Sequence, residues 1–254
     1  MLGIFDSGVG GLTVVKELLR RHSDADFLYL GDTARTPYGN KSPETIARYA
    51  VEDAQFLVSH GADVLVVACN SMSAHAMDAL HAAFPSVPIY EVITPAVAVA
   101  VATTKGRIGV IGTRATIASG LYEKRLKDAR ADVDVRSVAC PLFVPLVEEG
   151  MTSARETKMI VRRYLAPLRA AQIDTLILGC THYPLLTDVI QEKIGKRVTI
   201  IDSPSAVCDA MEKDRVVASG SSRQTFYFTD DNPRTREIAE KWLGRVVKIE
   251  RAAL

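Results

Sequence analysis

Short apolar segments alternate with longer amphipathic segments along most of the chain. The apolar segments are rich in Val, Ile and Leu, and the clearest of them span residues 63–68, 108–111 and 174–178. Uninterrupted apolar runs of this length are typical of strands that are buried on both faces of a parallel α/β sheet. The amphipathic segments have the period of a helix, and the best marked span residues 12–21, 43–60, 152–171 and 233–243.

An internal repeat organises these elements. Segment 63–71 reads Asp-Val-Leu-Val-Val-Ala-Cys-Asn-Ser and aligns with segment 174–182, which reads Asp-Thr-Leu-Ile-Leu-Gly-Cys-Thr-His. Near the same offset, segment 3–7 mirrors segment 109–113, and segment 87–97 corresponds to segment 198–207. The repeat predicts an α/β fold of two similar lobes, each a mainly parallel sheet flanked by helices, related by a pseudo-twofold axis across a cleft. A coincidental repeat within one continuous sheet is the alternative.

The segment after about residue 219 has no counterpart in the repeat. Its pattern predicts a strand at 225–228, a helix at 232–243 and a last strand at 246–249. We expect this tail to return to the first lobe. The predicted first lobe therefore comprises residues 1–94 and 208–254 and carries Cys69, and the second comprises residues 95–207 and carries Cys180.

Charge and hydropathy exclude several classes of partner. The formal net charge is +1, and there is no run of five like charges, so we expect neither nucleic acid nor an anionic membrane as a partner. The apolar segment 93–102 is far shorter than the roughly 20 residues of a membrane-spanning helix. The first predicted strand starts directly after Met1 and leaves no room for a signal peptide, so we expect a cytoplasmic protein.

Two of the four cysteines occupy equivalent positions in the repeat. Cys69 and Cys180 each follow a buried strand and precede a segment that turns helical, whereas Cys140 and Cys208 have no such match. Ligand sites gather at the carboxyl edge of parallel sheets, and helix-opening N–H groups there are expected to lower a thiol pKa from about 8.5 toward neutrality. One such cysteine alone is more often a small buried apolar side chain, whereas a pair at matched positions of the repeat favours a catalytic function.

Two thiols on opposite walls of a cleft suit proton transfer at a carbon atom. One thiolate can remove a proton from one face while the other thiol returns a proton to the opposite face, as racemisation next to a carboxylate requires. The chain has no Cys-x-x-Cys pair for dithiol redox chemistry. Cys180 and His182 form the only Cys/His cluster in the sequence, which offers too few ligands for a zinc site.

Polar residues beside these cysteines match the needs of a small amino-acid ligand. Neutral donors able to hold a carboxylate are supplied by Asn70, Ser71, Ser73 and Thr181. The loop Asp6-Ser7-Gly-Val-Gly-Gly11 lacks the spacing of a phosphate or dinucleotide loop, and its Asp would repel a phosphate. We therefore expect Asp6 to pair with a substrate ammonium or to assist proton movement at Cys69.

Three further ionisable residues are candidates by position. His182 follows Cys180 by two residues, and an imidazole can assist a thiol near neutral pH. Asp32 and Glu148 follow segments 27–30 and 143–147, which we interpret as strand or loop ends that reach the cleft. From position alone, a functional role and an ordinary solvated carboxylate are equally compatible with Asp32 and Glu148.

Seven ordered stretches carry a resemblance to glutamate racemases over essentially the whole chain. They are Phe5-Asp-Ser-Gly-Val-Gly-Gly11, Gly31-Asp-Thr-Ala-Arg35, Pro37-Tyr-Gly39, Ala68-Cys-Asn70, Gly112-Thr113 with Ala115-Thr-Ile117, Phe143-Val-Pro-Leu146 and Gly179-Cys-Thr-His-Tyr-Pro-Leu185. The family usually reads Cys-Asn-Thr-Ala where this chain has Cys69-Asn-Ser-Met72. Ser71 keeps the hydroxyl, whereas Met72 is bulkier and changes the local packing.

The resemblance implies a two-lobed fold and interconversion of L- and D-glutamate for peptidoglycan, with no cofactor, neither pyridoxal phosphate nor a metal. It implies that Cys69 and Cys180 are the catalytic thiols, assisted by Asp6 and His182 respectively. The positions that match substrate contacts are Asp6, Ser7, Tyr38, Gly39, Asn70, Ser71, Thr181 and His182. Supporting positions are Asp32, Glu148, Thr113 and Thr116.

Other functions compete with this interpretation. An aspartate racemase, or a related isomerase or decarboxylase that acts on a small dicarboxylate, would share these motifs. A regulatory role is a second alternative, because some proteins of this family restrain DNA gyrase; the near-neutral charge gives it no support. A homodimer is possible, since the family is often dimeric.

Overall fold

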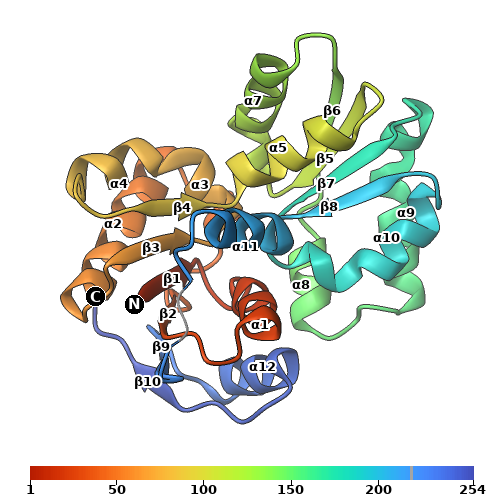
Figure 1. The fold of residues 1–254 in the computed structure, drawn as a ribbon. Coiled ribbons are helices and arrows are strands. Elements are labelled where there is room, and N and C mark those ends of the chain that lie inside the picture. The colour runs from red at the N-terminus through yellow and green to blue at the C-terminus, as the bar shows by residue number, and fades with distance from the viewer. Residues whose placement is uncertain (218–219) are drawn as a thin grey trace.

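The computed structural model describes residues 1–217 and 220–254, and it divides them into two lobes that are each built on a parallel sheet (Figure 1). The larger sheet has the strand order β10-β9-β2-β1-β3-β4 and the smaller has β6-β5-β7-β8. The strands of the first are β1 Leu2–Asp6, β2 Phe27–Gly31, β3 Val64–Val67, β4 Ile89–Glu91, β9 Gln224–Phe228 and β10 Ile249–Arg251. Those of the second are β5 Arg107–Gly112, β6 Asp134–Ala139, β7 Thr175–Gly179 and β8 Thr199–Asp202.

The repeat in the sequence is a repeat of topology. Strands β2-β1-β3-β4 of one sheet correspond in order and direction to β6-β5-β7-β8 of the other, and all their pairings are parallel. The fold class expected from the sequence is therefore confirmed. We keep as a proposal the division into residues 1–94 plus 208–254 and residues 95–207.

Alternate residues of the strands pack against different helices, as the twofold period of a strand requires. In β1, Ile4 belongs to the apolar core beneath α1, whereas Phe5 belongs to the core beneath α2. Helices α2 Pro43–Ser59, α3 Asn70–His75 and α4 Met77–Ala83 cover one face of the larger sheet. Helices α1 Leu12–Arg21 and α12 Pro233–Leu243 cover the other.

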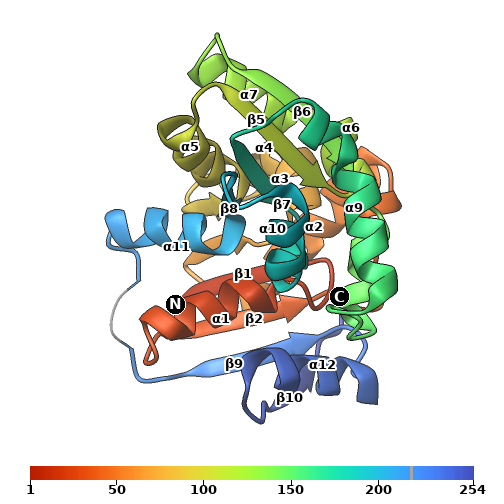
Figure 2. The ribbon, with the colours of Figure 1, turned by 90° about the vertical axis from the view of Figure 1, so that its right-hand side faces the viewer.

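The smaller sheet is covered in the same way. On one face lie α5 Ile93–Thr103 and α7 Leu121–Ala129; on the other lie α8 Phe143–Glu148, α9 Arg155–Ala170 and α10 Thr187–Ile194. Helix α11 Ser203–Lys213 contacts both α1 and α5 and so lies between the lobes (Figure 2). The remaining elements are α6 Arg114–Ala118 and the 3₁₀ turns Tyr38–Asn40 and Tyr183–Leu186.

Most predicted elements agree with the structure to within three residues, and one prediction is wrong. Segment 143–147 is not a strand or a loop but forms α8. The predicted last strand is present but begins later than residue 246: Val246 is 85% exposed, and pairing starts where Ile249 meets Phe226 of β9. The tail does join the larger sheet, because β9 pairs with β2. The point near residue 219 where the tail was expected to start lies outside the described residues.

None of the helices in the described part of the chain combines the length and the apolar character needed to cross a bilayer. Helix α5, which contains the apolar segment 93–102, ends at Thr103 after 11 residues.

Candidate active site

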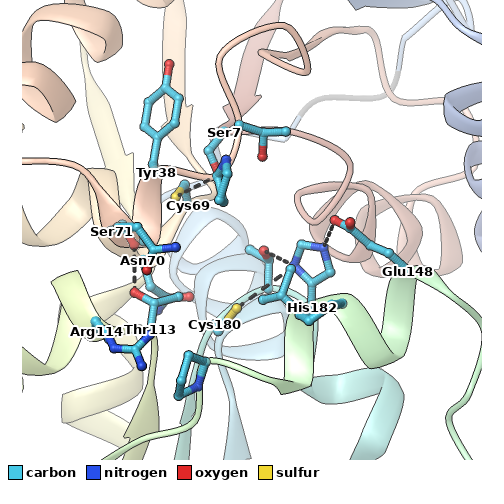
Figure 3. A pocket seen from close by; sticks show the side chains of 18 residues that line it. Ser7, Tyr38, Cys69, Asn70, Ser71, Thr113, Arg114, Glu148, Cys180 and His182 are labelled. Atoms are coloured by element: carbon cyan, nitrogen blue, oxygen red, sulfur yellow. Dashed lines mark hydrogen bonds and ion pairs between the residues drawn. The ribbon is translucent and has the colours of Figure 1, made fainter.

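A cavity of about 290 Å³ opens between the lobes at the carboxyl ends of their strands (Figure 3). The residues expected there from the first lobe that line it are Ser7, Tyr38, Gly39, Cys69, Asn70 and Ser71. Those from the second lobe are Thr113, Glu148, Cys180, Thr181 and His182. Four expected residues, Asp6, Asp32, Ser73 and Thr116, do not line it.

The two thiols lie in the walls that the two lobes contribute. Cys69 follows β3 and occupies the N-cap position of α3. Cys180 follows β7, the strand equivalent to β3. Each is 5% exposed, and both reach the cavity (Figure 3). Parallel strands place the residues that follow them at one edge of a sheet, so two facing sheets bring these two side chains to one cavity.

The Cys69 thiol is strongly desolvated. Burial raises its pKa to about 12, and the nearby Asp6 carboxylate adds to the rise. The bond to Ser7, with Sγ 3.5 Å from Oγ, only partly offsets this. The expectation of a pKa lowered toward neutrality is thus wrong for Cys69, because α3 is a six-residue helix whose N–H groups do not outweigh the loss of water.

Cys180 belongs to a chain of hydrogen bonds. Its Sγ lies 3.9 Å from Nδ1 of His182, and Nε2 of His182 lies 2.9 Å from Oε1 of Glu148. Burial disfavours the charged imidazolium, but the bonds to Cys180 and Glu148 outweigh it and raise the pKa of His182 to about 10. A thiol, an imidazole and a carboxylate in this order can pass a proton while the ring orientation stays fixed.

Asp6 lies behind the cavity wall. Its side chain is 1% exposed and accepts a bond from the N–H of Gly8 at 3.0 Å. Burial raises the pKa of Asp6, and the nearby His182 opposes the rise. The Thr181 hydroxyl donates to Oδ2 of Asp6 at 3.4 Å, which links the two lobes.

Hydroxyl and amide groups form the wall next to Cys69. The Ser71 hydroxyl bonds to Thr113 at 2.9 Å and to Thr116 at 3.2 Å, so Thr116 supports the wall from behind. Nδ2 of Asn70 donates to the Tyr122 hydroxyl at 2.9 Å, and Oδ1 of Asn70 has no partner among the described residues. A buried acceptor without a partner at a cavity is suited to a ligand N–H group.

Ser73 does not contribute a free donor, because its hydroxyl bonds to the carbonyl of Cys69 at 3.0 Å. Tyr38 contributes main chain, since its ring turns away from the cavity (Figure 3). Gly39 is in tight contact, because a Cβ there would lie 2.8 Å from Cβ of Thr113.

Asp32 belongs to a buried ionic cluster behind the cavity. Its carboxylate accepts bonds from the Tyr38 hydroxyl and, at 2.6 Å, from Nε of Arg35. Arg35 also bonds Asp53 at 2.9 Å and Glu52 at the surface. Burial raises the pKa of Asp53, as does the nearby Asp32. The cluster holds the loop whose residues 36–40 line the cavity, which places Asp32 in support of the wall.

We expect Arg35→Met to cost about 3 kcal/mol or more in the free energy of unfolding at pH 8, because it leaves two buried carboxyls without a cation. The folded pKa of Asp53 lies above its unfolded value, so its contribution to stability is present at low pH and is lost as pH rises. Without Arg35, the ionised forms of the buried carboxyls lose their cation and become less stable still. The loss of unfolding free energy in Arg35→Met should therefore be smaller at pH 5 than at pH 8, as measured by urea unfolding curves.

Arg48→Met is the matched control, because Arg48 also stacks on the Tyr49 ring, 4.9 Å from its centroid against 4.0 Å for Arg35. Arg48 has no carboxylate partner among the described residues. Equal deficits in the two variants would show that stacking, rather than the buried carboxyls, makes Arg35 important.

Sequence reasoning missed seven residues that line the cavity. Six are uncharged: Thr36, Pro37, Asn40, Pro141, Val144 and Pro145. The seventh, Arg114, is exposed, has no ion pair in the described chain, and lies beside Thr113 on the side of the cavity away from His182 and Glu148 (Figure 3). The signal that could have found it is its place directly after β5, the strand equivalent to β1.

Within residues 1–217 and 220–254, no group of three or more His, Cys, Asp or Glu side chains is arranged to hold a metal ion. All four cysteines are free thiols.

Known proteins resemble this chain over its full length. The sequence pattern of the family described as Asp/Glu/Hydantoin racemase matches residues 6–211. The glutamate racemase of Persephonella marina is 48% identical over 254 residues, which cover 100% of this chain and 97% of that protein.

Two solved structures are similar in fold as well as in sequence. The structure of a glutamate racemase from Bacillus anthracis has a TM-score of 0.93 and 38% identity, covering 100% of this chain and 97% of that one. A glutamate racemase from Francisella tularensis, solved in complex with D-glutamate, has a TM-score of 0.90 and 33% identity, covering 99% and 97%.

Proposed function

Because the chain belongs to the Asp/Glu/hydantoin racemase family, we propose that it interconverts L-glutamate and D-glutamate with Cys69 and Cys180 as the two acid–base groups. The observation that supports the proposal most strongly is that two thiols, at equivalent positions of a repeat, lie in the opposing walls of one cavity. Relatives named as glutamate racemases, one of them solved with D-glutamate, support glutamate as the substrate.

In the proposed reaction one cysteine, as thiolate, removes the proton from Cα, and the electron pair moves into the substrate carboxylate. The other cysteine, as thiol, then gives its proton to the opposite face of Cα. The substrate is inverted, and the two sulfurs have exchanged protonation states. Proton exchange with solvent or the reverse reaction restores the starting state, so no oxidant, reductant or cofactor is consumed.

Neighbouring groups assist the two thiols and hold the substrate. His182, oriented by Glu148, takes up or returns the proton of Cys180. Asp6 acts on the side of Cys69, whose high thiol pKa makes it a proton donor in the ligand-free protein. Neutral donors from Ser7, Ser71, Thr181 and Thr113 hold the carboxylates, and Oδ1 of Asn70 accepts from the substrate ammonium, while main chain at Tyr38 and Gly39 closes the cavity. Such donors stabilise the charge that develops in the transition state without quenching it.

The proposal also covers the cofactor requirement, the location and the cellular role of the enzyme. We propose that it needs no cofactor, acts in the cytoplasm and supplies D-glutamate for peptidoglycan, as the resemblance implies. A homodimer and a contact with gyrase stay predictions from the family.

Polarimetry of the purified protein tests the proposed function. The rotation of D- or L-glutamate should decay to zero without an added cofactor, and aspartate should react much more slowly. A stable rotation with both glutamate enantiomers would reject the proposal, and faster decay with aspartate would reassign the substrate.

We expect Arg114→Gln to raise KM for glutamate about threefold and to weaken the salt dependence of kcat/KM, with kcat little changed. Arg114 is the only Arg or Lys among the described residues that line the cavity, and glutamate carries two carboxylates. Initial rates at several ionic strengths measure the effect.

Arg163→Gln is the matched control for Arg114→Gln, because Arg163 is also exposed but lies on α9, away from the cavity. The same change of KM in both variants would assign the effect to net charge rather than to a contact at the cavity.

A further inference from the structure

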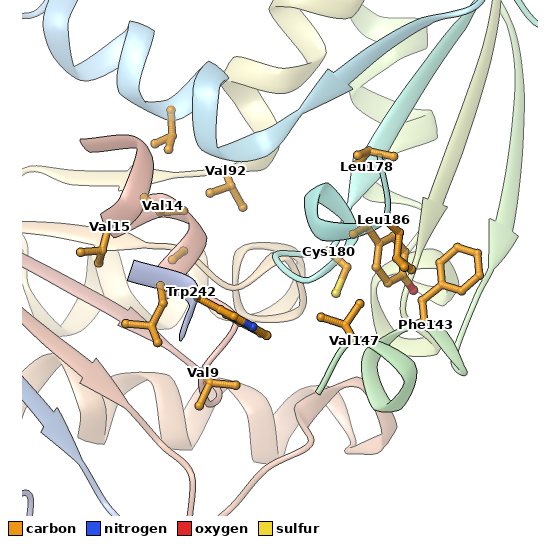
Figure 4. Packing of buried hydrophobic residues seen from close by; sticks show 14 of the residues in the cluster. Val9, Val14, Val15, Val92, Phe143, Val147, Leu178, Cys180, Leu186 and Trp242 are labelled. Atoms are coloured by element: carbon orange, nitrogen blue, oxygen red, sulfur yellow. The ribbon is translucent and has the colours of Figure 1, made fainter. Parts of the chain in front are cut away.

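Helix α12 belongs to the tail that has no counterpart in the repeat, yet it reaches one side of the candidate active site. It packs on α1 of the first lobe, while His182 and Glu148 belong to the second. The indole of Trp242 meets the imidazole of His182 edge to face, with ring centroids 5.5 Å apart and planes at 89°. Trp242 is buried, and Figure 4 shows it between Val9 and the side chains of Cys180 and Val147.

A second contact of α12 reaches Glu148. Nη2 of Arg234, in the first turn of the helix, donates a hydrogen bond to the main-chain carbonyl of Glu148. The same guanidinium lies 3.6 Å from the carboxylate of Glu149 and 3.0 Å from that of Glu237. Arg234 thus holds the backbone of the residue whose carboxylate bonds to His182.

We propose that α12 is a positioning element for the His182–Glu148 pair, with Trp242 limiting the tilt of the imidazole and Arg234 fixing the backbone of Glu148. The inference rests on the proposed function, because it gives the pair the task of moving a proton at Cys180. Since α12 is anchored on the first lobe, it holds the pair in place only while the lobes keep their relative position. No residue of α12 lines the cavity itself, and the contacts that α12 makes through Trp242 and Arg234 reach the lining residues His182 and Glu148, on the side of Cys180.

The groups around His182 show whether α12 acts on it by position or by charge. The titratable groups that face the ring are Cys180, Glu148 and, more weakly, Asp6. The contact from α12 is an indole, which does not titrate. Loss of an α12 contact should therefore act through the geometry of the bond between His182 and Glu148, and geometric errors at a proton-transfer site lower kcat rather than substrate affinity.

Arg234→Gln and Arg236→Gln form a matched pair of variants. Both arginines lie in the first turns of α12, are 45% and 43% exposed, and pair with surface carboxylates at 3.0 and 2.8 Å. Only Arg234 reaches Glu148. We expect Arg234→Gln to lower kcat about three- to tenfold at unchanged KM, the range set by one hydrogen bond, and Arg236→Gln to stay within twofold of the parent protein.

Trp242 variants test the ring contact. Trp242→Phe keeps an aromatic side chain next to His182, whereas Trp242→Leu keeps only an apolar one. A larger loss of kcat in Trp242→Leu than in Trp242→Phe, at equal melting temperatures, supports positioning by the ring. Equal losses would overturn that part of the inference.

Intrinsic fluorescence gives a readout that does not need turnover, because Trp242 is the only tryptophan in the chain. A protonated imidazole in contact with an indole quenches it, so emission should rise as pH passes the pKa of His182, which the bonds to Cys180 and Glu148 raise to about 10 against the effect of burial. His182→Gln should remove this transition. Arg234→Gln should move this transition to lower pH by weakening the bond that His182 donates to Glu148, and Arg236→Gln should leave it in place.

A transition at the same pH in Arg234→Gln, Arg236→Gln and the parent protein would overturn the inference, whether or not the protein racemises glutamate. Failure of the parent protein to racemise glutamate would instead reject the proposed function.

Discussion

Cys69→Ala and Cys180→Ala are each expected to lower kcat for glutamate racemisation by about 10³-fold or more, in both directions. Each variant lacks the group that must act on one face of Cα, and the remaining thiol cannot reach the opposite face. General acid–base groups contribute about 10²- to 10⁴-fold, and two that act in sequence lose most of their effect when either is removed. Coupled assays with each enantiomer as starting substrate measure the loss.

Cys208→Ala is the control for the cysteine variants. Cys208 is 1% exposed and sits in α11, but it does not line the cavity, so its removal should leave the rate unchanged. Each active-site variant should still exchange or eliminate from one enantiomer of a suitable analogue. Retention of a tenth of the parent rate by either variant would contradict the assignment of two essential thiols.

Gly10→Ala is expected to lower kcat by about 10²-fold while the protein stays folded. A Cβ at this position would lie 2.2 Å from Oγ1 of Thr181 and 2.6 Å from Nδ1 of His182, far inside van der Waals contact. Both side chains must move, and His182 would then lose its alignment with Cys180. Displacement of a catalytic group by about 1 Å costs on the order of 10²-fold in rate.

Gly8→Ala provides the control in the same loop, because a Cβ there meets only the side chain of Thr36, at 3.2 Å. Its rate should remain within a few fold of the parent. Full activity in Gly10→Ala, with circular dichroism unchanged, would show that His182 tolerates displacement and would remove the basis for its role at Cys180.

The repeat explains why so much of the architecture could be predicted from the sequence. Two buried strands with the same flanking pattern must occupy equivalent places in equivalent sheets, so the sequence alone predicts that Cys69 and Cys180 face each other. Helices such as α1 and α12 are predicted from their period, and α12 also has a capping residue at its start. The side chain of Asn232, for example, accepts a bond from the N–H of Thr235.

Side-chain direction is what the sequence could not provide. Tyr38 and Asp32 are near cavity-lining residues in the sequence, but their side chains point away from the cavity. The Tyr38 hydroxyl donates to Asp32, which belongs to the ionic cluster around Arg35. Residues such as Arg114 and Pro141 carry no local pattern that marks them as part of a wall. The expectation for the pKa of Cys69 was wrong because the degree of burial, which raises it, depends on tertiary packing that no local pattern marks.

One isotope measurement tests the central claim, that two thiols act from opposite faces. The protein is given D-glutamate or L-glutamate in deuterated buffer, the reaction is stopped at low conversion, and the two enantiomers are separated for mass spectrometry. The account predicts one deuterium at Cα of the newly formed enantiomer and none in the remaining substrate, from either direction. Deuterium in the remaining substrate at a comparable level, or protium retained in the product, would mean that a single base serves both faces and would contradict the account.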